Sequence, residues 1–413
     1  MARPAPKAQA PDWQEPSSYH TICLQLRLIT PLFGGGYEAR EVDPVCIIRP
    51  ATIRGHLRYW WRALYGGQYS SCSQMFEEES NLWGGASDGN KDRAGKVSLW
   101  VQQVQWGQKE ITVNNFQPRG SPAKVGPEAQ YLLYVFGEQK KENIPPAKGY
   151  TDVSFTLCVR LHPSLNSHKR QQVENTLKAW IALGGIGART RRGCGALTVA
   201  QQREKWLPPA DPKAREQWFS HLAPPSSNST AVRFTSLPGT RLICGAPVAE
   251  TQWMKVLHDL GSFWARFRKG HVGKGVTYTP MAGCKWQDYR GALVPFSKRK
   301  SDPISLCKPY LGLPIVYQRF KNAPFDSAVE AQDTGRMASP VILKPMALAD
   351  GRICPVCAVL RAPQPRAVQI QGARVSLQVR KDDQVLHALN VTHPLAAVIV
   401  AAEQQWNSRA FTI

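Results

Sequence analysis

The stretch WIALGGIGARTRRGCGALTVA, residues 180–200, joins the end of an amphipathic helix to a glycine-rich loop and then to a short apolar strand. Its central part, 183–197, holds five glycines and three arginines. Glycine permits backbone conformations with φ > 0 and the close approach of another backbone or of a phosphate. Two interpretations follow: a clasp for an anion, or a tight helix-to-strand turn in which Gly184 follows the helix end and the arginines point into water.

The loop lacks the spacing of the two common nucleotide-binding loops. A P-loop needs a second glycine, followed by lysine, five positions after the first, but Arg189, Thr190 and Arg192 stand at those positions. A dinucleotide fingerprint needs a third glycine where Ala188 and Thr190 stand, and it opens a helix, whereas this loop follows one. We therefore expect no mononucleotide or dinucleotide pocket here.

The whole chain is strongly basic. Its 413 residues contain 52 Lys and Arg against 30 Asp and Glu, a formal net charge of +22. Because the excess is spread along the chain, it indicates a polyanionic partner; a basic protein without any nucleic-acid role is the alternative. With 43% hydrophobic residues the chain can bury sizeable cores, and its length predicts two domains.

The sequence shows no export or membrane signal. The Pro- and Ala-rich tail has no hydrophobic stretch, and the longest apolar run, at 394–402, is too short to span a bilayer. We therefore expect a cytoplasmic protein without a membrane partner, with its ten cysteines reduced rather than paired in disulfides. Only Cys354 and Cys357 form a CxxC pair, so we expect no metal site, although His387 and His393 could contribute ligands.

Apolar periodicity predicts strand, helix, strand twice over in the first half of the chain. Alternating apolar residues are typical of half-buried strands, and apolar residues at helical spacing indicate helices. In an antiparallel sheet this order is the split βαβ arrangement of a ferredoxin-like fold, here with 107–150 as a long insertion. The predicted strands are 19–31, 97–106, 155–163 and 197–200, and the predicted helices are 50–67 and 164–185.

Composition also predicts the domain boundaries. Proline and serine clusters after the first set of elements are typical of a linker, and a strongly apolar helix at 251–267 opens a second set. Short strands are predicted there at 312–320, 339–348 and 375–380. The predicted parts are a disordered tail at 1–17, a ferredoxin-like module at 18–202, a linker at 203–232 and a second module at 233–413.

Three arginines recur along the first predicted helix. Arg54, Arg58 and Arg62 are spaced i, i+4, i+8 and so form one ridge beside the apolar stripe. No Asp or Glu occurs between Pro44 and Phe76, and like charges at this spacing cost roughly 0.2–0.5 kcal/mol per pair. We predict that an external anion compensates the ridge; the alternative is pairing with carboxylates from another segment.

A second basic stretch, 262–310, combines ten Lys and Arg with only Asp288 and Asp302. Its aromatic residues alternate with the charges, a composition typical of surfaces that bind single-stranded nucleic acid. Within it Trp264 and Phe267 are expected in the core. The predicted surface contacts are Lys274 and Lys285 for phosphates and Tyr278, Trp286 and Tyr289 for bases.

The sequence contains no nucleophile elbow, HExxH motif or carboxylate cluster, so we predict no catalytic residue. His56 lies beside the arginine ridge, and a metal-independent ribonuclease could use such a histidine as general base. A packed or solvated histidine is the alternative.

Several motifs together resemble the RAMP superfamily of CRISPR effector proteins, and within it the first subunits of type III-B Cmr complexes. The motifs are dense in the first half and sparser in the second. They are TPLFGGG (30–36), IRPATIRGHLRYWWRAL (48–64), LWGGASDGNKDRAGKVSL (82–99), LGGIGARTRRGCGAL (183–197), YLGLPIVY (310–317) and GRMASPVILKP (335–345).

The resemblance implies an α+β protein of two ferredoxin-like, RRM-like RAMP modules, acting as a non-catalytic subunit near the 3′ end of a guide RNA. The implied partners are guide RNA, target RNA and the other Cmr subunits, with no cofactor. A guide-processing endoribonuclease and a mainly scaffolding subunit are the alternatives. By position, the implied RNA contacts are Trp61, Gly184, Gly185, Gly187, Arg189, Arg191, Arg192, Gly193 and Gly195. We find no second glycine-rich loop in the C-terminal half.

Overall fold

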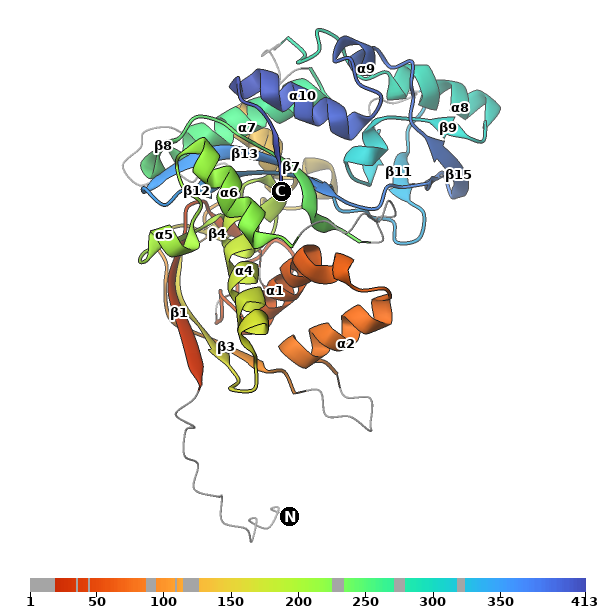
Figure 1. Ribbon diagram of the computed structural model, residues 1–413. Helices are drawn as coiled ribbons and strands as arrows, with labels where there is room; N and C mark the ends of the chain where they lie inside the picture. The colour runs from red at the N-terminus through yellow and green to blue at the C-terminus, as the bar shows by residue number, and fades with distance from the viewer. Residues whose placement is uncertain are drawn as a thin grey trace, which may run out of the picture.

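The computed structural model describes residues 19–34, 36–43, 45–86, 94–107, 110–113, 126–224, 234–270, 279–317 and 324–413. The fold is α+β and is built around three sheets of four or five strands (Figure 1). Among the described residues, none of the helices has the length and apolar character needed to cross a membrane.

The N-terminal sheet is antiparallel and has the strand order β3-β5-β1-β6. Alternation explains its buried face: Ile22, Leu24, Leu26 and Leu28 are each at most 7% exposed. All four strands are those predicted from the sequence. Their bounds are β1 (His20–Leu28), β3 (Val97–Gln105), β5 (Ser154–Leu161) and β6 (Leu197–Val199).

The two predicted helices, α1 (Pro50–Tyr65) and α4 (Ser167–Leu183), pack side by side on this sheet. Pro50 suits the first turn of α1 because its missing N–H needs no partner there, and Asn166 caps α4 through the backbone N–H of Lys169. A further helix, α2 (Cys72–Trp83), follows α1 and packs against it.

The C-terminal half contains a second sheet with the same connectivity, in the order β12-β13-β7-β16. In the N-terminal half the glycine-rich loop connects the last helix to the last strand of the sheet. The equivalent connection here, from α10 to β16, consists of residues 407–410 alone. The absence of a second glycine-rich loop from the sequence is thereby explained. The elements are β7 (Ser236–Cys244), α7 (Trp253–Arg268), β12 (Val341–Ala347), β13 (Arg352–Arg361), α10 (Pro394–Trp406) and β16 (Phe411–Thr412), with β8 (Val248–Ala249) paired to β13.

The two halves share one continuous hydrophobic core. Helices α1 and α4 contact strands of both sheets, and α3 (Pro127–Leu133), from the predicted insertion, packs on α7. The predicted linker is more structured than expected. Its first part forms α5 (Arg203–Trp206) and α6 (Pro212–Leu222), which bury Trp206 and Phe219 because both helices lie against the halves they connect.

A small accessory lobe, unforeseen in the sequence, has a separate core and a sheet in the order β10-β11-β14-β15-β9. Figure 1 shows it beside the C-terminal sheet, around α8, β9 and β15. Two insertions build it, one before β12 and one after β13. Its elements are the π-helical η6 (Asp288–Leu293), α8 (Val294–Arg299), β9 (Ile304–Ser305), β10 (Ile315–Val316), β11 (Ala328–Ala331), β14 (Ala367–Ile370) and β15 (Ala373–Gln378).

The remaining elements are short. β2 pairs with β4, and the 3₁₀ turns close connections between longer elements. They are β2 (Leu32–Phe33), η1 (Gly66–Gln68), η2 (Tyr134–Phe136), η3 (Lys140–Glu142), β4 (Gly149–Tyr150), η4 (Thr190–Arg192), η5 (Glu250–Gln252), η7 (Lys308–Leu311) and α9 (Gln384–Ala388).

One pair of cysteines departs from the expectation that all are reduced. Cys23 of β1 and Cys158 of β5 stand directly opposite each other and form a disulfide. Their register in the antiparallel pair brings the two side chains together, and the sequence spacing of 135 residues gave no sign of it. Cys354 and Cys357 lie on β13, where a separation of three residues points them to opposite faces.

Candidate nucleic-acid interface

The arginine ridge lies on one side of α1, but only Arg54 is exposed and without an ion pair among the described residues. The buried carboxylate of Glu79, from α2, accepts hydrogen bonds from Arg58 Nε and Arg62 Nη1, each at 2.5 Å. The prediction of an uncompensated ridge is therefore wrong for two of its three members. The alternative, pairing with a carboxylate from another segment, is the arrangement observed.

Trp61 belongs to the core and not to a surface. Its side chain is 0% exposed, and its Nε1 donates a hydrogen bond to Gln172 Oε1 of α4 at 3.1 Å. The assignment of Trp61 as an RNA contact is therefore wrong. Position 61 continues the stripe of Ile53, Leu57 and Leu64 that faces the core of the N-terminal half.

The glycines of the loop allow the protein to pack on itself. A Cβ on Gly184 would lie 2.6 Å from the indole nitrogen of Trp60, and one on Gly195 would overlap the carbonyl of Ile186. Only Gly187, with φ 86°, is partly exposed. Burial removes the other four from the predicted RNA contacts, namely Gly184, Gly185, Gly193 and Gly195.

Two of the loop arginines bind groups of the protein itself. Arg189 Nη2 donates to the carbonyl of Leu132 at 2.7 Å. Arg191 donates to the carbonyl of Ser339 and, at 2.8 Å, to the hydroxyl of Tyr59. The prediction that they extend to RNA conflicts with these bonds, because an intramolecular acceptor already holds each guanidinium.

Arg192 joins the two halves of the molecule. It is 8% exposed, donates to the carbonyl of Val341 in β12 at 2.6 Å, and lies 4.9 Å from the ring centroid of Trp264 in α7. In the opposite direction, the fully buried Lys344 of β12 donates to the carbonyl of Gly184 at 2.7 Å. We call these contacts of Arg191, Arg192 and Lys344 the clasp.

Arg192 and Lys344 of the clasp are buried, and Arg191 is half-buried. Among the described residues, no carboxylate forms an ion pair with Arg191, Arg192 or Lys344. Burial lowers the pKa of Lys344 to about 7. Sequence analysis missed Lys344 because a lysine in the apolar run VILKPMA has no local signal for a buried position.

A pocket of about 220 Å³ opens beside the accessible part of the loop. Its walls are the N-terminus of α1, the connection after β2 and the start of the glycine-rich loop, and Arg49 is the basic residue among its described lining residues. The backbone N–H groups and dipole at a helix N-terminus favour an anion there. The lining residues are Leu32, Gly34, Gly36, Ile47, Ile48, Arg49, Thr52, Ile53, Ile186 and Gly187.

Arg49 is itself held by an acid. Its guanidinium pairs with Asp43, whose second role is to accept the backbone N–H groups of Val45 and Cys46, each at 2.9 Å. These three interactions lower the pKa of Asp43 to about 2, with the bond from Cys46 as the largest cause.

The basic stretch 262–310 divides into core and surface. Trp264 and Phe267 are buried as expected, and Trp286 is also buried, with its Nε1 donating to the carbonyl of Phe267. Trp286 is therefore not the predicted stacking platform. Lys285 is exposed, as an anion contact requires. Tyr289 donates to the carbonyl of Phe325. The predictions for Lys274 and Tyr278 fall outside the described residues.

His56 is poorly placed for acid–base chemistry. Its ring is half-buried in α1, its Nδ1 is buried and has no hydrogen-bond partner in the part of the chain that the structure describes, and burial lowers its pKa. A general base needs hydrogen-bond reach to the proton that it removes. The packed alternative describes this residue better.

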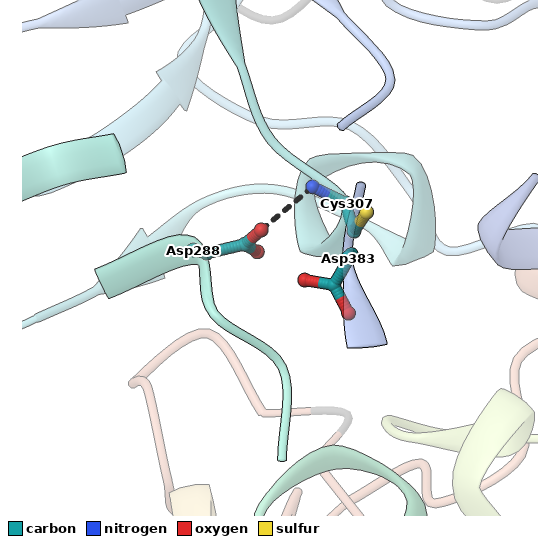
Figure 2. Close-up of side chains that lie close together, drawn as sticks. All are labelled: Asp288, Cys307 and Asp383. Atoms are coloured by element: carbon teal, nitrogen blue, oxygen red, sulfur yellow. Dashed lines mark hydrogen bonds between the residues drawn. The ribbon is translucent and has the colours of Figure 1, made fainter. Parts of the chain in front are cut away.

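One cluster of potential metal ligands is present among the described residues: Asp288, Cys307 and Asp383, all buried (Figure 2). Burial raises the pKa of Asp288 and of Cys307. The carboxylates connect separate segments of the chain where the accessory lobe adjoins the main core, so the cluster has a structural role. Each of their four oxygens accepts a backbone N–H group at 2.7 to 3.0 Å, from residues 287, 307, 308 and 385.

Comparison with known sequences gives a family model and a curated relative, each matching less than half of the chain. A family model described as the RAMP superfamily matches residues 25–198, from β1 to β6. The protein "CRISPR system Cmr subunit Cmr1-2" of Pyrococcus furiosus is 29% identical over 203 residues, which cover 45% of this chain and 97% of that protein.

Two solved structures are similar along most of the chain, at low sequence identity. The apo crystal structure of Cmr1 from Pyrococcus furiosus covers 84% of this chain and 89% of its own, with a TM-score of 0.49 and 15% identity. A chain of the type III-B Cmr-beta complex bound to cognate target RNA covers 93% of this chain and 100% of its own, with a TM-score of 0.46 and 12% identity.

Proposed function

Since residues 25–198 place this chain in the RAMP superfamily, as a Cmr1-like protein, we propose that it is an RNA-binding subunit of a type III-B CRISPR effector complex. The observation that carries the proposal is the match to Cmr1-2 along 97% of that protein. The net charge of +22 supports a polyanionic partner. The proposed partners are guide RNA, target RNA and the other Cmr subunits, with sequence read by base pairing and the protein contacting phosphate and sugar.

We further propose that both halves are ferredoxin-like RAMP modules. Numbered along the chain, the four strands of each half lie side by side in the order second, third, first, fourth. In each half a helix follows the first strand and another follows the third. This is the split βαβ arrangement. The connection before the fourth strand has thirteen residues in the N-terminal module, 184–196, and four in the C-terminal module, 407–410. The glycine-rich loop is therefore a feature of the N-terminal module.

The proposed RNA surface is smaller than the one expected from sequence. It is centred on the N-terminal turns of α1, where Arg54 is exposed and has no ion pair with any described residue. It also includes the adjacent pocket lined by Arg49 and Gly187. Lys285 is a second, separate contact. The clasp arginines contribute positive potential from below the surface instead of direct bonds.

A salt titration tests this surface. Arg54→Ala removes one phosphate contact, so we expect weaker binding of single-stranded guide RNA and a smaller slope of log K against log salt, by about 0.7. Fluorescence polarisation between 50 and 200 mM salt measures both. Arg374→Ala is the matched control, because Arg374 is also exposed but lies on β15 of the accessory lobe. Equal slopes for wild type and Arg54→Ala would contradict the assignment.

We also propose that the subunit is not itself a nuclease. The half-buried His56 supports this, because it lacks the access that a general base requires. The rival function is a guide-processing endoribonuclease. Incubating the isolated chain with precursor RNA in EDTA separates the two, and cleavage that disappears in His56→Ala would establish the rival.

A further inference from the structure

A second pocket, of about 290 Å³, lies at the junction of the two halves. Tyr59 and Arg62 line it from α1, and Phe234, Thr235 and Pro363 line it from the C-terminal half. None of these lining residues is acidic. Two aromatic side chains, a guanidinium and a hydroxyl therefore converge on one cavity that exists only when the halves are packed together.

The aromatic walls are held in place by neighbouring groups. The hydroxyl of Tyr59 accepts a hydrogen bond from Arg191 Nη2 at 2.8 Å, and the guanidinium carbon lies 5.6 Å from the centroid of the tyrosine ring. Phe234 rests on the backbone of Gly66, where an added Cβ would lie 2.5 Å from the phenyl ring. Because their positions are fixed before any ligand enters, a flat ligand loses little binding energy to ordering these side chains.

The charges around the cavity select an anionic ligand with a flat aromatic part. Glu79 neutralises Arg62 through Nη1 alone, and the side chain of Arg62 remains 35% exposed. Arg191 stands behind Tyr59 without a carboxylate partner among the described residues. Unstacked RNA bases bind proteins on aromatic rings and guanidinium planes, with cationic groups near the backbone.

We propose that this junction pocket binds one base of a single-stranded RNA, stacked on its aromatic side chains, with Arg62 beside the neighbouring phosphate. The inference rests on the proposed RNA-binding function and deepens it by assigning a base-stacking position between the two halves. A free nucleotide shares the same chemistry, and the experiment separates it from an RNA strand.

The test uses the full chain and single-stranded RNA that carries one 2-aminopurine, whose fluorescence falls when the base stacks on an aromatic ring. Phe234→Leu keeps an apolar side chain but removes the ring. We expect it to abolish quenching at the responsive position and to weaken binding by about fivefold to a hundredfold, with the salt slope unchanged. Phe234→Tyr retains a ring and should restore both signals.

Trp106→Leu is the control variant, because Trp106 is a 48% exposed aromatic residue outside the pocket. Wild-type behaviour of Phe234→Leu at every labelled position would overturn the pocket while leaving RNA binding intact. Absence of RNA binding by the wild-type chain would instead overturn the proposed function. Quenching of 2-aminopurine riboside monophosphate without quenching of the labelled strand would overturn RNA as the ligand.

Discussion

At the scale of single residues, the buried amine of Lys344 connects the two halves through hydrogen bonds. Lys344 Nζ reaches two carbonyl oxygens, of Gly184 at 2.7 Å and of Ile181 at 3.4 Å, both at the C-terminal end of α4. A neutral amine has two N–H donors, so deprotonation leaves both bonds in place. The charged form, in contrast, would lie in the core with no carboxylate from the described residues to pair with it.

The pKa of Lys344 predicts a pH-dependent stability. It is about 7 in the folded protein and near 10.5 in the unfolded chain, so between these values only the unfolded state holds the proton. The free energy of unfolding should therefore rise with pH in this window, by about 1.4 kcal/mol per unit. Urea unfolding at pH 7 and pH 9 measures the rise.

Lys344→Met is the reference for that measurement, because methionine has a similar length and no titrating group. We expect the variant to lose this contribution while other groups titrate as before. Identical pH slopes in the two proteins would show that Lys344 stays charged in the fold.

At the scale of elements, the pair of α1 and α2 decides which arginines face solvent. Glu79 belongs to α2, the helix that follows α1 in the chain. It comes three residues after the stretch without Asp or Glu, which ends at Phe76. Its carboxylate bridges Arg58 and Arg62, and so α2 holds the lower part of the ridge against the protein. The upper turn of α1 carries the exposed Arg54, whereas Arg62 remains 35% exposed at the junction pocket even though Glu79 binds it.

Glu79→Gln should lower the stability of the fold and raise its affinity for RNA. Removing the buried carboxylate leaves two guanidiniums without their acid, which lowers the free energy of unfolding by on the order of 3 kcal/mol. The released arginines add positive charge beside the proposed RNA surface, so RNA affinity and its salt slope should both increase. Urea unfolding and polarisation titrations measure the two effects.

Glu77→Gln is the matched control, since Glu77 is exposed on the same helix. It should change neither quantity appreciably. A Glu79→Gln protein that is folded, less stable and unchanged in RNA affinity would show that the α1 ridge does not face RNA.

At the scale of the whole molecule, the two halves pack around one core. Their hydrophobic residues merge into a single core, and the clasp connects the glycine-rich loop of one half to β12 of the other. The accessory lobe has a core of its own, and beside it Asp288 and Asp383 bind backbone N–H groups of residues 287, 307, 308 and 385 (Figure 2).

The double variant Arg191→Ala, Arg192→Ala should weaken the contact between the halves. It leaves the carbonyls of Ser339 and Val341 without their donors and removes the side chain that packs on Trp264. Each lost bond to a charged donor costs about 1.5–3 kcal/mol, so we expect a lower midpoint in differential scanning calorimetry and a transition that separates into two.

Arg54→Ala, on the exposed side of α1, should leave the thermogram unchanged and is the control. An unaltered single transition in the double variant would mean that the shared core alone couples the halves. Because this variant changes the fold, a loss of RNA binding in it would not identify an RNA contact.

Local pattern predicted the regular elements but not their partners. Period-two and helical spacing predicted β1, β5, α1 and α4 correctly, because each pattern depends on neighbouring residues that the same element positions. Strand β13 is buried almost throughout its length and so has no alternation to detect. The accessory lobe escaped prediction because two distant segments must meet to form its core.

The sequence by itself determined that the chain is basic, that it alternates strands with amphipathic helices, and that its glycine-rich loop follows α4. Only the tertiary structure decided what the basic residues do. Arg58 and Arg62 donate hydrogen bonds to Glu79, and Arg192 donates one to the carbonyl of Val341 in β12. Arg54 is exposed to solvent. The physical reason is that the partner of a long charged side chain is set by whichever segment packs within reach, and sequence spacing carries no record of it.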